Sequence, residues 1–463
     1  MTKKSILRLL QASLMCCLAV LFTACDDVFG NEDNPMSAYL SMSDKPVTLK
    51  AGDTYRRKAI SVTSAVVEYT SSKTDVATVD NEGLVTAKAE GTTTITATAT
   101  GYSSQNGKKI YQPASVSYVV TVVSATVPAT SLSLDKTMKV LVKDGAALTL
   151  TATVTPTDAT DKTVTWESSD AAVATVNNGV VTPVGLGIAT ITAKSGDLKA
   201  TCEVFVGTEV DDVSARNPIQ DYDILAGTNN SSAITIPADC HVAFNGVNTD
   251  KGVKCNGEAT IYLIDGSTNT ITAQDDYAGI EVGAAGLTIN AETAGTGILN
   301  VTGGFKGAGI GTSEAYNSSQ TCGDITINGG TITATGGNGA AGIGTGYSFG
   351  GSAPTNQTCG DITINGGIVT ATGGMYGAGI GTGYSFNNGA VTSNECGAIT
   401  IGTGVTSVTA TKGTGSPSPI SIGMGASNGY SNYGIQTCGT ITIGGDATTY
   451  AAGVTTSPFT YEP

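Results

Sequence analysis

One stretch of sequence that recurs almost unchanged constrains this chain more than any other feature. Residues 322–346 read CGDITINGGTITATGGNGAAGIGTG, and residues 359–383 read CGDITINGGIVTATGGMYGAGIGTG. Weaker copies precede and follow these two. A repeat of this length forms a unit that cannot bury its own apolar face, so each copy must stack on its neighbours.

Each copy carries short runs in which apolar and polar residues alternate. In the first copy the apolar pairs are Ile325 with Ile327, Ile332 with Ala334, and Ala341 with Ile343. Such alternation predicts short strands, and the Gly-Gly or Gly-x-Gly that follows each run predicts a turn. We therefore predict three strands and three turns per copy, which is the pattern of one coil of a parallel β-helix.

The repeat domain extends over residues 233–463. With parallel strands about 4.8 Å apart, about seven coils would span roughly 35 Å. Three segments rich in Ser, Asn and Tyr separate the clear copies: residues 313–321, 347–358 and 384–395. We expect these loops to gather on one edge of the solenoid, where a binding surface usually lies.

Residues 39–123 and 127–206 are two copies of a different domain. Both contain short alternating strands about 8–12 residues apart with Gly or Asn-Gly turns, which predicts a β-sandwich. Tyr69 and Trp166 are expected as core aromatic residues between the sheets. Residues 26–38 are expected to be a tether and residues 207–232 a linker.

The second of these copies contains SLSLDK, TATVTPTDAT, WESSD and GIATITA. It resembles the bacterial Ig-like group 2 (BIG2) domain. The first copy departs from the pattern, because Tyr69 replaces the Trp, the V-x-P-x-x-A-T segment is missing, and residues 101–113 form an insertion. The resemblance implies stalks and adhesive modules of bacterial surface proteins, with no known chemistry.

The GGxxGAGIG signature of the repeats resembles β-helix domains of Bacteroidetes and Firmicutes surface proteins. Less specifically, it is similar to a carbohydrate-binding β-helix family related in fold to pectate lyases. The expected fold class is therefore all-β, with two Ig-like β-sandwiches followed by a right-handed parallel β-helix.

Residues 1–25 have the features of a secretion signal. Lys and Arg precede an apolar core that is too short for a membrane-spanning helix. The segment ends in FTAC, which resembles a bacterial lipobox and implies that Cys25 is the lipid attachment site. A plain secretory signal is the alternative. The Asp-Asp that follows resembles a surface-export signal of Bacteroidetes lipoproteins, which implies a lipid-anchored outer-membrane protein exposed on the cell surface.

The charge balance limits the classes of partner. The net charge is −15, which argues against nucleic acid and against attraction to anionic lipid. Contact with a membrane is expected only through the N-terminal lipid. The chain has one histidine, His241, which we expect to be structural, so most His-based catalytic schemes are excluded.

Four cysteines occupy the same place in successive coils: Cys322, Cys359, Cys396 and Cys438. None forms a C-x-x-C pair, so a zinc or redox motif is not indicated. We predict an inward ladder of reduced thiols. One or two disulfides, with Cys240–Cys255 as a candidate, are the alternative.

Several aromatic residues in the repeat domain could contact a ligand. The candidates are Tyr347, Phe349, Tyr376, Tyr384, Phe386, Tyr430 and Tyr433. Aromatic side chains aligned along one edge could stack on sugar rings. The alternative is that they pack down and close the corners of the helix.

The acidic residues do not indicate a catalytic site. Asp324 and Asp361 recur at a strand start, beside the cysteines. Pectate-lyase-like catalysis would need clustered Asp for Ca²⁺ together with a basic residue, and the repeat domain has very few Lys and Arg. We predict no enzyme activity, no catalytic or metal-ligating residue and no cofactor, although oxygen-rich loops leave Ca²⁺ binding open.

These features predict a non-enzymatic cell-surface lipoprotein in which an Ig-like stalk presents a β-helix for adhesion or ligand binding. The alternative is a dedicated polysaccharide-binding module, assisted by Ca²⁺ or not, and a polysaccharide lyase is less favoured. The expected partner is a glycan or a host or surface protein.

Overall fold

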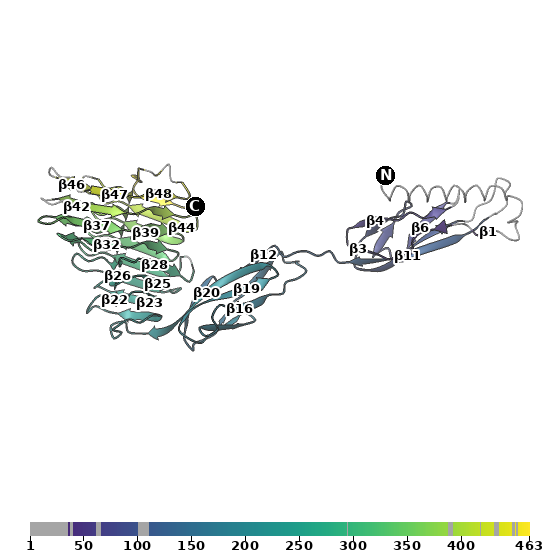
Figure 1. The fold of residues 1–463 in the computed structure, drawn as a ribbon, viewed down its shortest axis with the longest axis horizontal. Coiled ribbons are helices and arrows are strands. Elements are labelled where there is room, and N and C mark those ends of the chain that lie inside the picture. Colours follow the sequence, from purple (N-terminus) through teal and green to yellow (C-terminus); the bar gives the residue numbers. More distant parts are fainter. Residues whose placement is uncertain are drawn as a thin grey trace, which may run out of the picture. The chain divides into compact units, whose positions relative to one another are not determined.

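The computed structural model describes residues 36–463, apart from 38–39, 62–65, 101–110, 294, 388–391, 417, 430–434, 447–449 and 451. The predicted leader and Cys25 lie outside the described residues. Strands and turns make up the fold (Figure 1), which divides into two compact units, Met1–Pro128 and Ala129–Pro463. Within the described part of the chain, no helix is long and apolar enough to cross a membrane.

The first unit is an Ig-like β-sandwich. One sheet has the order β3 (Val47–Lys50), β11 (Ala114–Val123), β9 (Gly91–Ala99), β6 (Val67–Ser71). The second has the order β4 (Thr54–Arg56), β8 (Leu84–Ala87), β7 (Ala77–Val79). Two short pairs flank them: β1 (Met36–Ser37) with β10 (Tyr111–Gln112), and β2 (Leu40–Ser41) with β5 (Ile60–Ser61). Tyr69 is buried in the core as predicted, and its hydroxyl accepts a hydrogen bond from the Ala59 amide at 2.7 Å.

The second Ig-like domain opens the second unit. Its main sheet has the order β16 (Thr165–Ser168), β19 (Gly187–Ser195), β20 (Leu198–Val210), β13 (Met138–Val142), with β13 parallel to β20. Facing it are β14 (Leu148–Thr149), β18 (Val180–Pro183) and β17 (Ala174–Asn177), with β12 (Ser131–Leu134) paired to β15 (Ala152–Thr155). Trp166 packs against this core and is half-buried.

Strand β20 belongs to both the Ig-like domain and the β-helix. Its first part pairs with β19, and Thr208 to Val210 then pair with β21 (Asp223–Thr228), the first strand of the solenoid sheet. The segment 207–232, expected as a linker, is therefore largely part of the folded unit. The reason is that the last strand of the sandwich continues directly into the sheet of the β-helix.

A buried carboxylate also joins the two domains. Glu292, at the end of a β-helix strand, is buried and accepts hydrogen bonds from Lys139 Nζ at 2.6 Å and from the Val140 amide at 2.7 Å. Phe205 of β20 packs against Tyr222 and Tyr262, with ring centroids 5.7 and 5.0 Å away. Hydrogen bonds to a buried charged group are among the stronger ones, so the second Ig-like domain and the β-helix form one body.

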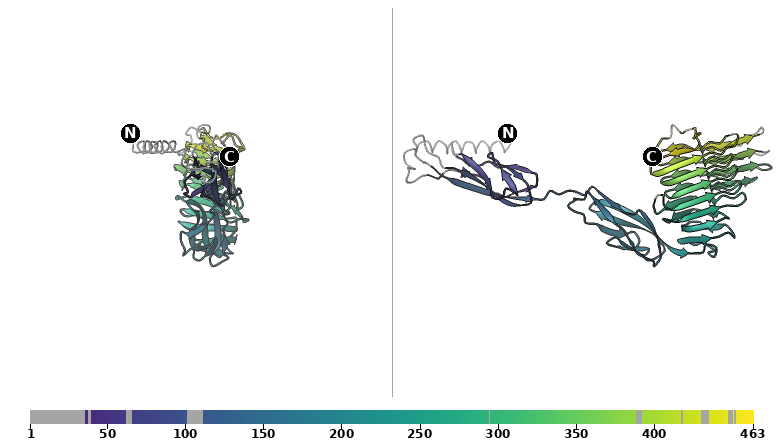
Figure 2. Two further views of the ribbon diagram at one scale, coloured as in Figure 1. Left: turned by 90° about the vertical axis from the view of Figure 1, so that its right-hand side faces the viewer. Right: turned by 180° about the vertical axis from the view of Figure 1, so that it is seen from behind.

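The β-helix is built from columns of parallel strands that stack along its axis (Figure 2). After β23 (Cys240–Thr249), the first column contains β25 (Ala259–Leu263), β28 (Leu287–Ala291), β33 (Ile325–Ile327), β38 (Ile362–Ile364), β43 (Ile399–Ile401) and β48 (Ile441–Ile443). The second contains β26 (Thr268–Thr272), β29 (Ile298–Thr302), β34 (Thr331–Thr335), β39 (Gly367–Thr372) and β44 (Val405–Thr411), and is closed by the antiparallel β49 (Phe459–Tyr461). The third contains β22 (Ile234–Ile236), β24 (Val253–Cys255), β27 (Ile280–Glu281), β30 (Ile310–Gly311), β35 (Ile343–Gly344), β40 (Ile380–Gly381) and β45 (Ile422–Gly423).

Two further columns correct the predicted three strands per coil. The fourth contains β31 (Ala315–Tyr316), β36 (Ser348–Gly350), β41 (Ser385–Asn387) and β46 (Ser427–Gly429). The fifth contains β32 (Gln320–Cys322), β37 (Thr355–Cys359), β42 (Thr392–Cys396) and β47 (Ile435–Cys438). Each of the Ser/Asn/Tyr-rich segments expected as loops therefore contains two strands, and the clear copies have five strands per coil.

The core sits inside the stack. The apolar pairs predicted from the first clear copy all have fully buried side chains, and the equivalent isoleucines of neighbouring coils lie in register with them. Tight stacking also explains the glycine of the third column. Gly344 has φ of +130°, and a Cβ there would overlap the Gly381 carbonyl oxygen of the next coil.

We predict that Ile364→Ala lowers the free energy of unfolding of the second unit by about 2–5 kcal/mol, because it removes a fully buried side chain and leaves a cavity. Thr363→Ala, on the outward face of the same strand, should change it by less than about 0.5 kcal/mol. Urea denaturation followed by circular dichroism measures both. Equal effects would contradict the inward orientation of Ile364.

Candidate ligand-binding face

Three aromatic side chains stand in one row on the fourth column, and we call them the aromatic strip: Tyr316, Phe349 and Phe386. They occupy paired positions of β31, β36 and β41. The Tyr316 and Phe349 ring centroids are 5.0 Å apart with planes 3° from parallel, and those of Phe349 and Phe386 are 5.5 Å apart and 10° from parallel. In-register pairing places one ring on each coil, so the strip runs along the helix axis.

The strip is accessible at Tyr316. This side chain is 58% exposed, whereas Phe349 and Phe386 are half-buried. Among the described strands, β31 is the first of its column, so none of that column lies beneath Tyr316. Parallel rings cover part of one another's faces. The strip therefore offers the ring edges of its members and one free ring face with a hydroxyl, at Tyr316.

The other described candidates lie beside the strip in a more buried cluster. Tyr384 is only 6% exposed, and its ring centroid is 4.7 Å from that of Tyr376 and 5.4 Å from that of Tyr347. Burial raises the pKa of the Tyr347 hydroxyl, and Lys306 Nζ lies 5.0 Å from the centroid of that ring. Tyr347 and Tyr376 are half-buried. These tyrosines pack against each other, and Tyr384 is a packing residue. Tyr430 and Tyr433 lie outside the described residues.

Lys306 also pairs with an acidic residue close to this cluster. Its ammonium group forms an ion pair with Glu314, whose side chain is 9% exposed. Burial, helped by the neighbouring Asp276, raises the pKa of Glu314, and Lys306 opposes that shift. The positive charge over Tyr347 is thus compensated by Glu314.

A row of polar side chains supports the strip from inside and was not predicted. Gln357, Asn394 and Gln436 occupy paired positions on the fifth column. The Gln357 amide donates to the carbonyl oxygens of Ser313 at 3.1 Å and Tyr347 at 2.7 Å, and its oxygen accepts from the Thr312 hydroxyl at 2.6 Å. Buried polar groups are tolerated when they are hydrogen-bonded in this way.

The threonine of each GIGT segment completes this inner polar row. Thr312, Thr345 and Thr382 are buried, and each hydroxyl accepts a hydrogen bond at 2.8 Å from a glycine amide of the next coil. The sequence did contain a signal for the row, since Gln or Asn stands two residues before each ladder cysteine. This row fixes the turn between the third and fourth columns, from which the strip projects.

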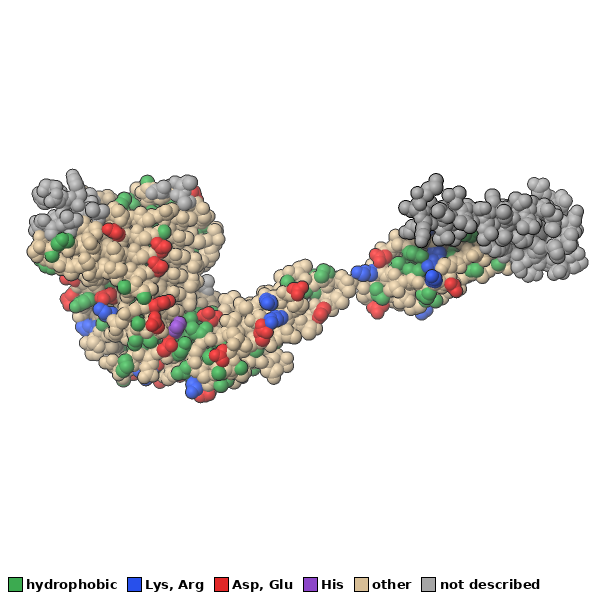
Figure 3. Space-filling model, viewed as in Figure 1, with side chains coloured by type: hydrophobic (Ala, Val, Ile, Leu, Met, Phe, Trp, Pro, Cys, Tyr) green, Lys and Arg blue, Asp and Glu red, His purple; other side chains and the backbone are tan. Residues whose placement is uncertain are grey.

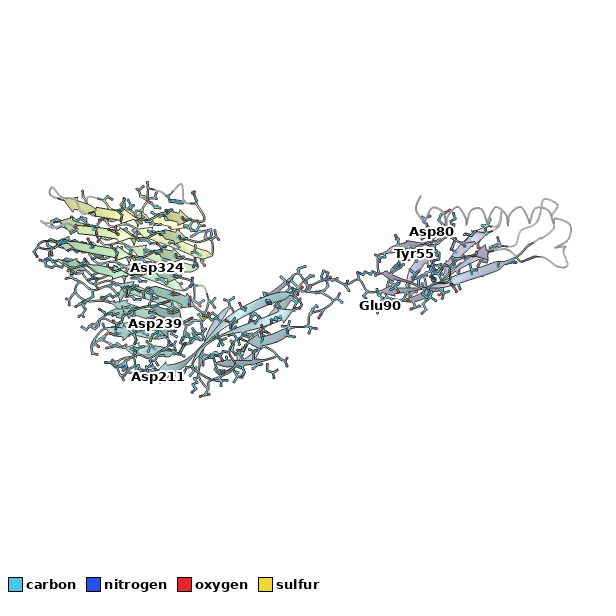
Figure 4. All side chains as sticks on the ribbon, in the orientation of Figure 1. Tyr55, Asp80, Glu90, Asp211, Asp239 and Asp324 are labelled. Carbon is cyan, nitrogen blue, oxygen red and sulfur yellow. The ribbon has the colours of Figure 1, made fainter. Side chains whose placement is uncertain are left out.

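The recurring acids are structural. The Asp324 carboxylate accepts a hydrogen bond from the Asp361 amide at 2.8 Å, and the Asp361 carboxylate accepts one from the Ala398 amide at 2.7 Å. Figure 4 shows Asp239 and Asp324 on the same side of the β-helix, one above the other. In the part of the chain that the structure describes, no group of three or more His, Cys, Asp and Glu side chains is placed to hold a metal ion.

His241 has a structural environment, as expected for a lone histidine. Its ring stacks on Tyr222 with centroids 5.6 Å apart, and its Nδ1 lies 3.2 Å from a carboxylate oxygen of Asp221. It is seen in Figure 3 among acidic side chains on the lower part of the β-helix. No nucleophilic side chain forms a hydrogen bond with it among the described contacts.

The cysteines form the predicted ladder at the end of each fifth-column strand. Cys322, Cys359, Cys396 and Cys438 are paired in register, and all four are free. The Sγ atoms of Cys322 and Cys359 are 2.9 Å apart. The alternative Cys240–Cys255 disulfide is not formed, since these two residues lie in different columns and both are free and buried.

Known protein families match the two domain types. Residues 39–110 and 128–204 match the bacterial Ig-like domain (group 2), and residues 325–347 and 362–384 match a β-helix repeat. This chain carries tandem BIG2 domains followed by a β-helix repeat domain. The predicted tandem BIG2 domains, the β-helix repeats and the all-β fold class are confirmed by these matches together with the strands.

The individual relatives cover small parts of the chain. An uncharacterised protein of Clostridium acetobutylicum is 37% identical over 144 residues, which are 30% of this chain and 14% of that protein. An α-L-arabinofuranosidase of Bifidobacterium longum is 57% identical over 60 residues, 12% of this chain and 6% of that enzyme. Mouse cadherin-23 repeats EC22–24 align with a TM-score of 0.23 at 15% identity, covering 37% of this chain and 63% of theirs. The chain thus spans a small fraction of the curated relatives it matches.

The buried and the exposed aromatic residues should differ in how much they contribute to the free energy of unfolding. We predict that Tyr384→Ala lowers the free energy of unfolding by about 3–5 kcal/mol, as expected for a large buried ring. Tyr316→Ala, which truncates an exposed ring at the end of the strip, should cost less than about 1 kcal/mol. Urea denaturation of both variants measures the difference. A large loss in Tyr316→Ala would contradict a surface role for that ring.

Proposed function

We propose that this protein is a cell-surface carbohydrate-binding protein, in which BIG2 domains carry a β-helix that contacts glycan through the aromatic strip. The two domain types together suggest a surface or carbohydrate-interacting protein. The observation that carries the narrower proposal is the in-register row of Tyr316, Phe349 and Phe386. Tyr316 supplies an exposed ring with a hydroxyl, and Phe349 and Phe386 supply uncharged ring edges beside it.

The surroundings of the strip favour a preformed site. The Asn317 side-chain oxygen accepts hydrogen bonds from the amides of Gly351 at 2.8 Å and Ser352 at 2.9 Å, which holds the turn that follows Phe349. A rigid surface loses little conformational entropy when it binds a ligand. With one ring per coil, a polysaccharide chain lying along the axis would meet equivalent groups on successive coils.

Two relatives that share a short segment with this chain are named as enzymes that act on carbohydrates. The Bifidobacterium longum proteins that share a short segment with this chain are an α-L-arabinofuranosidase and a 3-O-α-D-galactosyl-α-L-arabinofuranosidase, and both names denote enzymes that act on carbohydrates. The shared segment covers 12% of this chain in each case. We propose no enzyme activity for this chain, because the acids of the β-helix hold its own backbone together.

Adhesion to a host or surface protein is the second candidate. The observation that favours it is the presence of exposed large apolar side chains on the β-helix outside the strip, including Tyr277 and Phe305, each 60% exposed. A protein partner could bury such side chains as a patch. The same binding experiment distinguishes the two candidates.

We predict that a glycan-array screen of the purified protein finds saturable binding that Tyr316→Ala weakens about 2- to 12-fold, the equivalent of ~0.5–1.5 kcal/mol for one aromatic contact. Tyr277→Ala, which removes an equally exposed ring outside the strip, is the matched control and should bind as well as the wild type. Repeating the screen with EDTA tests for Ca²⁺ dependence.

Two outcomes would overturn the glycan proposal. One is the absence of saturable sugar binding together with retention on host matrix protein, which would favour adhesion. The other is equal weakening in Tyr316→Ala and Tyr277→Ala. Release of unsaturated uronate from pectin would contradict the non-enzymatic assignment itself.

We also propose that the chain is anchored by lipid on Cys25 and displayed at the surface of the outer membrane. The support is the sequence FTAC after an apolar core, followed by an acidic pair. Cys25→Ser should abolish labelling with palmitate and move the protein from the membrane to the soluble fraction. Persistent labelling of Cys25→Ser would rule out Cys25 as the lipid attachment site, and Cys16→Ser is the control that should still be labelled.

A further inference from the structure

We propose that the four cysteines of the fifth column are a thiol–disulfide relay, in which a small-molecule disulfide reacts at Cys438 and the disulfide then passes coil by coil to Cys322. The inference is independent of the glycan proposal. It rests on where the four sulfurs lie, on which of them can be reached, and on which pairings the stack allows.

The register places the sulfurs in a row. Cys322 pairs with Cys359, Cys359 with Cys396, and Cys396 with Cys438. Neighbouring parallel strands lie about 4.8 Å apart, which is within the range of Cα separations that disulfides span. The Sγ atoms of Cys322 and Cys359 are 2.9 Å apart, so closing to a bond of about 2.05 Å needs less than 1 Å of movement.

Access to the row differs between its two ends. Cys322, Cys359 and Cys396 are buried, and Cys438 is half-buried on β47, the last strand of its column in the described chain. Cys438 is therefore the thiol that an external disulfide can reach. The other three can be oxidised only through a neighbour in the row.

The chemistry of the relay balances at each step. The Cys438 thiolate attacks a glutathione disulfide and releases one glutathione. The Cys396 sulfur then attacks the Cys438 sulfur and releases the second glutathione, which leaves a Cys396–Cys438 bond. Two protein thiols have lost two electrons and two protons, and one glutathione disulfide has been reduced to two thiols.

The following steps are internal exchanges without net oxidation. Cys359 attacks Cys396, which breaks the Cys396–Cys438 bond and returns Cys438 to the thiol. Cys322 then attacks Cys359, which returns Cys396 to the thiol and leaves a Cys322–Cys359 bond. A thiolate attacking a disulfide approaches along the line of the S–S bond, and a row of sulfurs provides that line. The 2.9 Å separation of the Cys322 and Cys359 Sγ atoms places them close enough for the last of these steps.

Only one pattern of two disulfides can use all four cysteines of the fifth column. A Cys359–Cys396 bond would strand Cys322 and Cys438, which are separated by two intervening coils. A Cys322–Cys359 bond leaves Cys396 and Cys438 adjacent, so a second glutathione disulfide can oxidise them. Full oxidation therefore yields Cys322–Cys359 with Cys396–Cys438.

The acidity of Cys396 fits its role, whereas hydrogen bonds with Cys322 and Cys396, together with burial, raise the pKa of Cys359 and should slow its attack. Hydrogen bonds from Cys359 and Cys438 hold the pKa of Cys396 well below its usual value, which favours Cys396 as the sulfur that resolves the mixed disulfide. The hydrogen bond to Cys396, together with burial, raises the pKa of Cys438. Since the thiolate is the nucleophile, the first step should be slow at neutral pH and should speed up as the pH rises.

The test is a time course with oxidised glutathione on the reduced purified protein, with disulfides mapped by peptide mass spectrometry. In the wild type, Cys396–Cys438 should appear first and Cys322–Cys359 later. Cys438→Ala should form Cys322–Cys359 at least tenfold more slowly. Cys396→Ala should accumulate glutathione on Cys438 and form no Cys322–Cys359 bond.

Cys202→Ala, which removes a buried thiol of the second Ig-like domain, is the matched control and should follow the wild-type time course. The relay is overturned if Cys322–Cys359 forms in the wild type before any Cys396–Cys438 bond has formed. It is also overturned if Cys438→Ala or Cys396→Ala forms that bond as fast as the wild type, and if the wild type forms no disulfide in the row.

Discussion

Backbone hydrogen bonding between successive coils is the interaction on which the second unit depends. Each strand of the β-helix pairs in register with the equivalent strand of the next coil, so residues at the same place of the repeat lie one above another. Every side-chain type then forms a row along the axis. Isoleucine rows make the apolar core, a glycine row allows the close approach of the third column, and an aspartate row ties one coil to the backbone of the next.

The same constraint creates the candidate functional features. Aromatic residues at paired positions become a strip, and cysteines at paired positions become a row of adjacent thiols. Neither feature needs a pocket or a loop. Strand pairing also explains why the second Ig-like domain is not a freely hinged stalk. Strand β20 pairs directly with the first strand of the β-helix sheet, and Glu292 accepts a hydrogen bond from the sandwich.

Sequence reasoning succeeded where apolar residues alternate and failed where polar residues face inward. The alternation of Ile325 with Ile327 identified the strands of the first three columns, and the repetition of cysteines identified the ladder. The fourth and fifth columns were expected as loops because Gln357, Thr355 and Ser348 are polar, yet all three are buried. The burial of Gln357 and Thr355 depends on hydrogen bonds to backbone carbonyls and hydroxyls that only the folded coil brings within reach, and no pattern of hydrophobicity records this. Among the described residues the buried Ser348 hydroxyl has no hydrogen-bond partner.

The candidate ligand-binding face could also be predicted only in part from the sequence. The sequence placed Phe349 and Phe386 at equivalent positions, and the structure stacks them. It could not tell that Tyr384, two residues before Phe386, is buried, or that Tyr316 completes the strip, because these outcomes depend on packing between coils. The linker at 207–232 was expected from acidic and Gly/Asn-rich composition. A strand can nevertheless form in such a segment when the unpaired edge of a sheet is available to pair with it.

The segments between the repeated stretches contain ordered strands on a buried polar row, from which the aromatic strip projects. Amide hydrogen exchange tests this most directly. The account predicts that residues 348–350 and 355–359 exchange about as slowly as the strand Ile362–Ile364, because their amides are bonded to neighbouring coils. Exchange of these residues at the rate of an unprotected loop, beside a protected Ile362–Ile364, would contradict it.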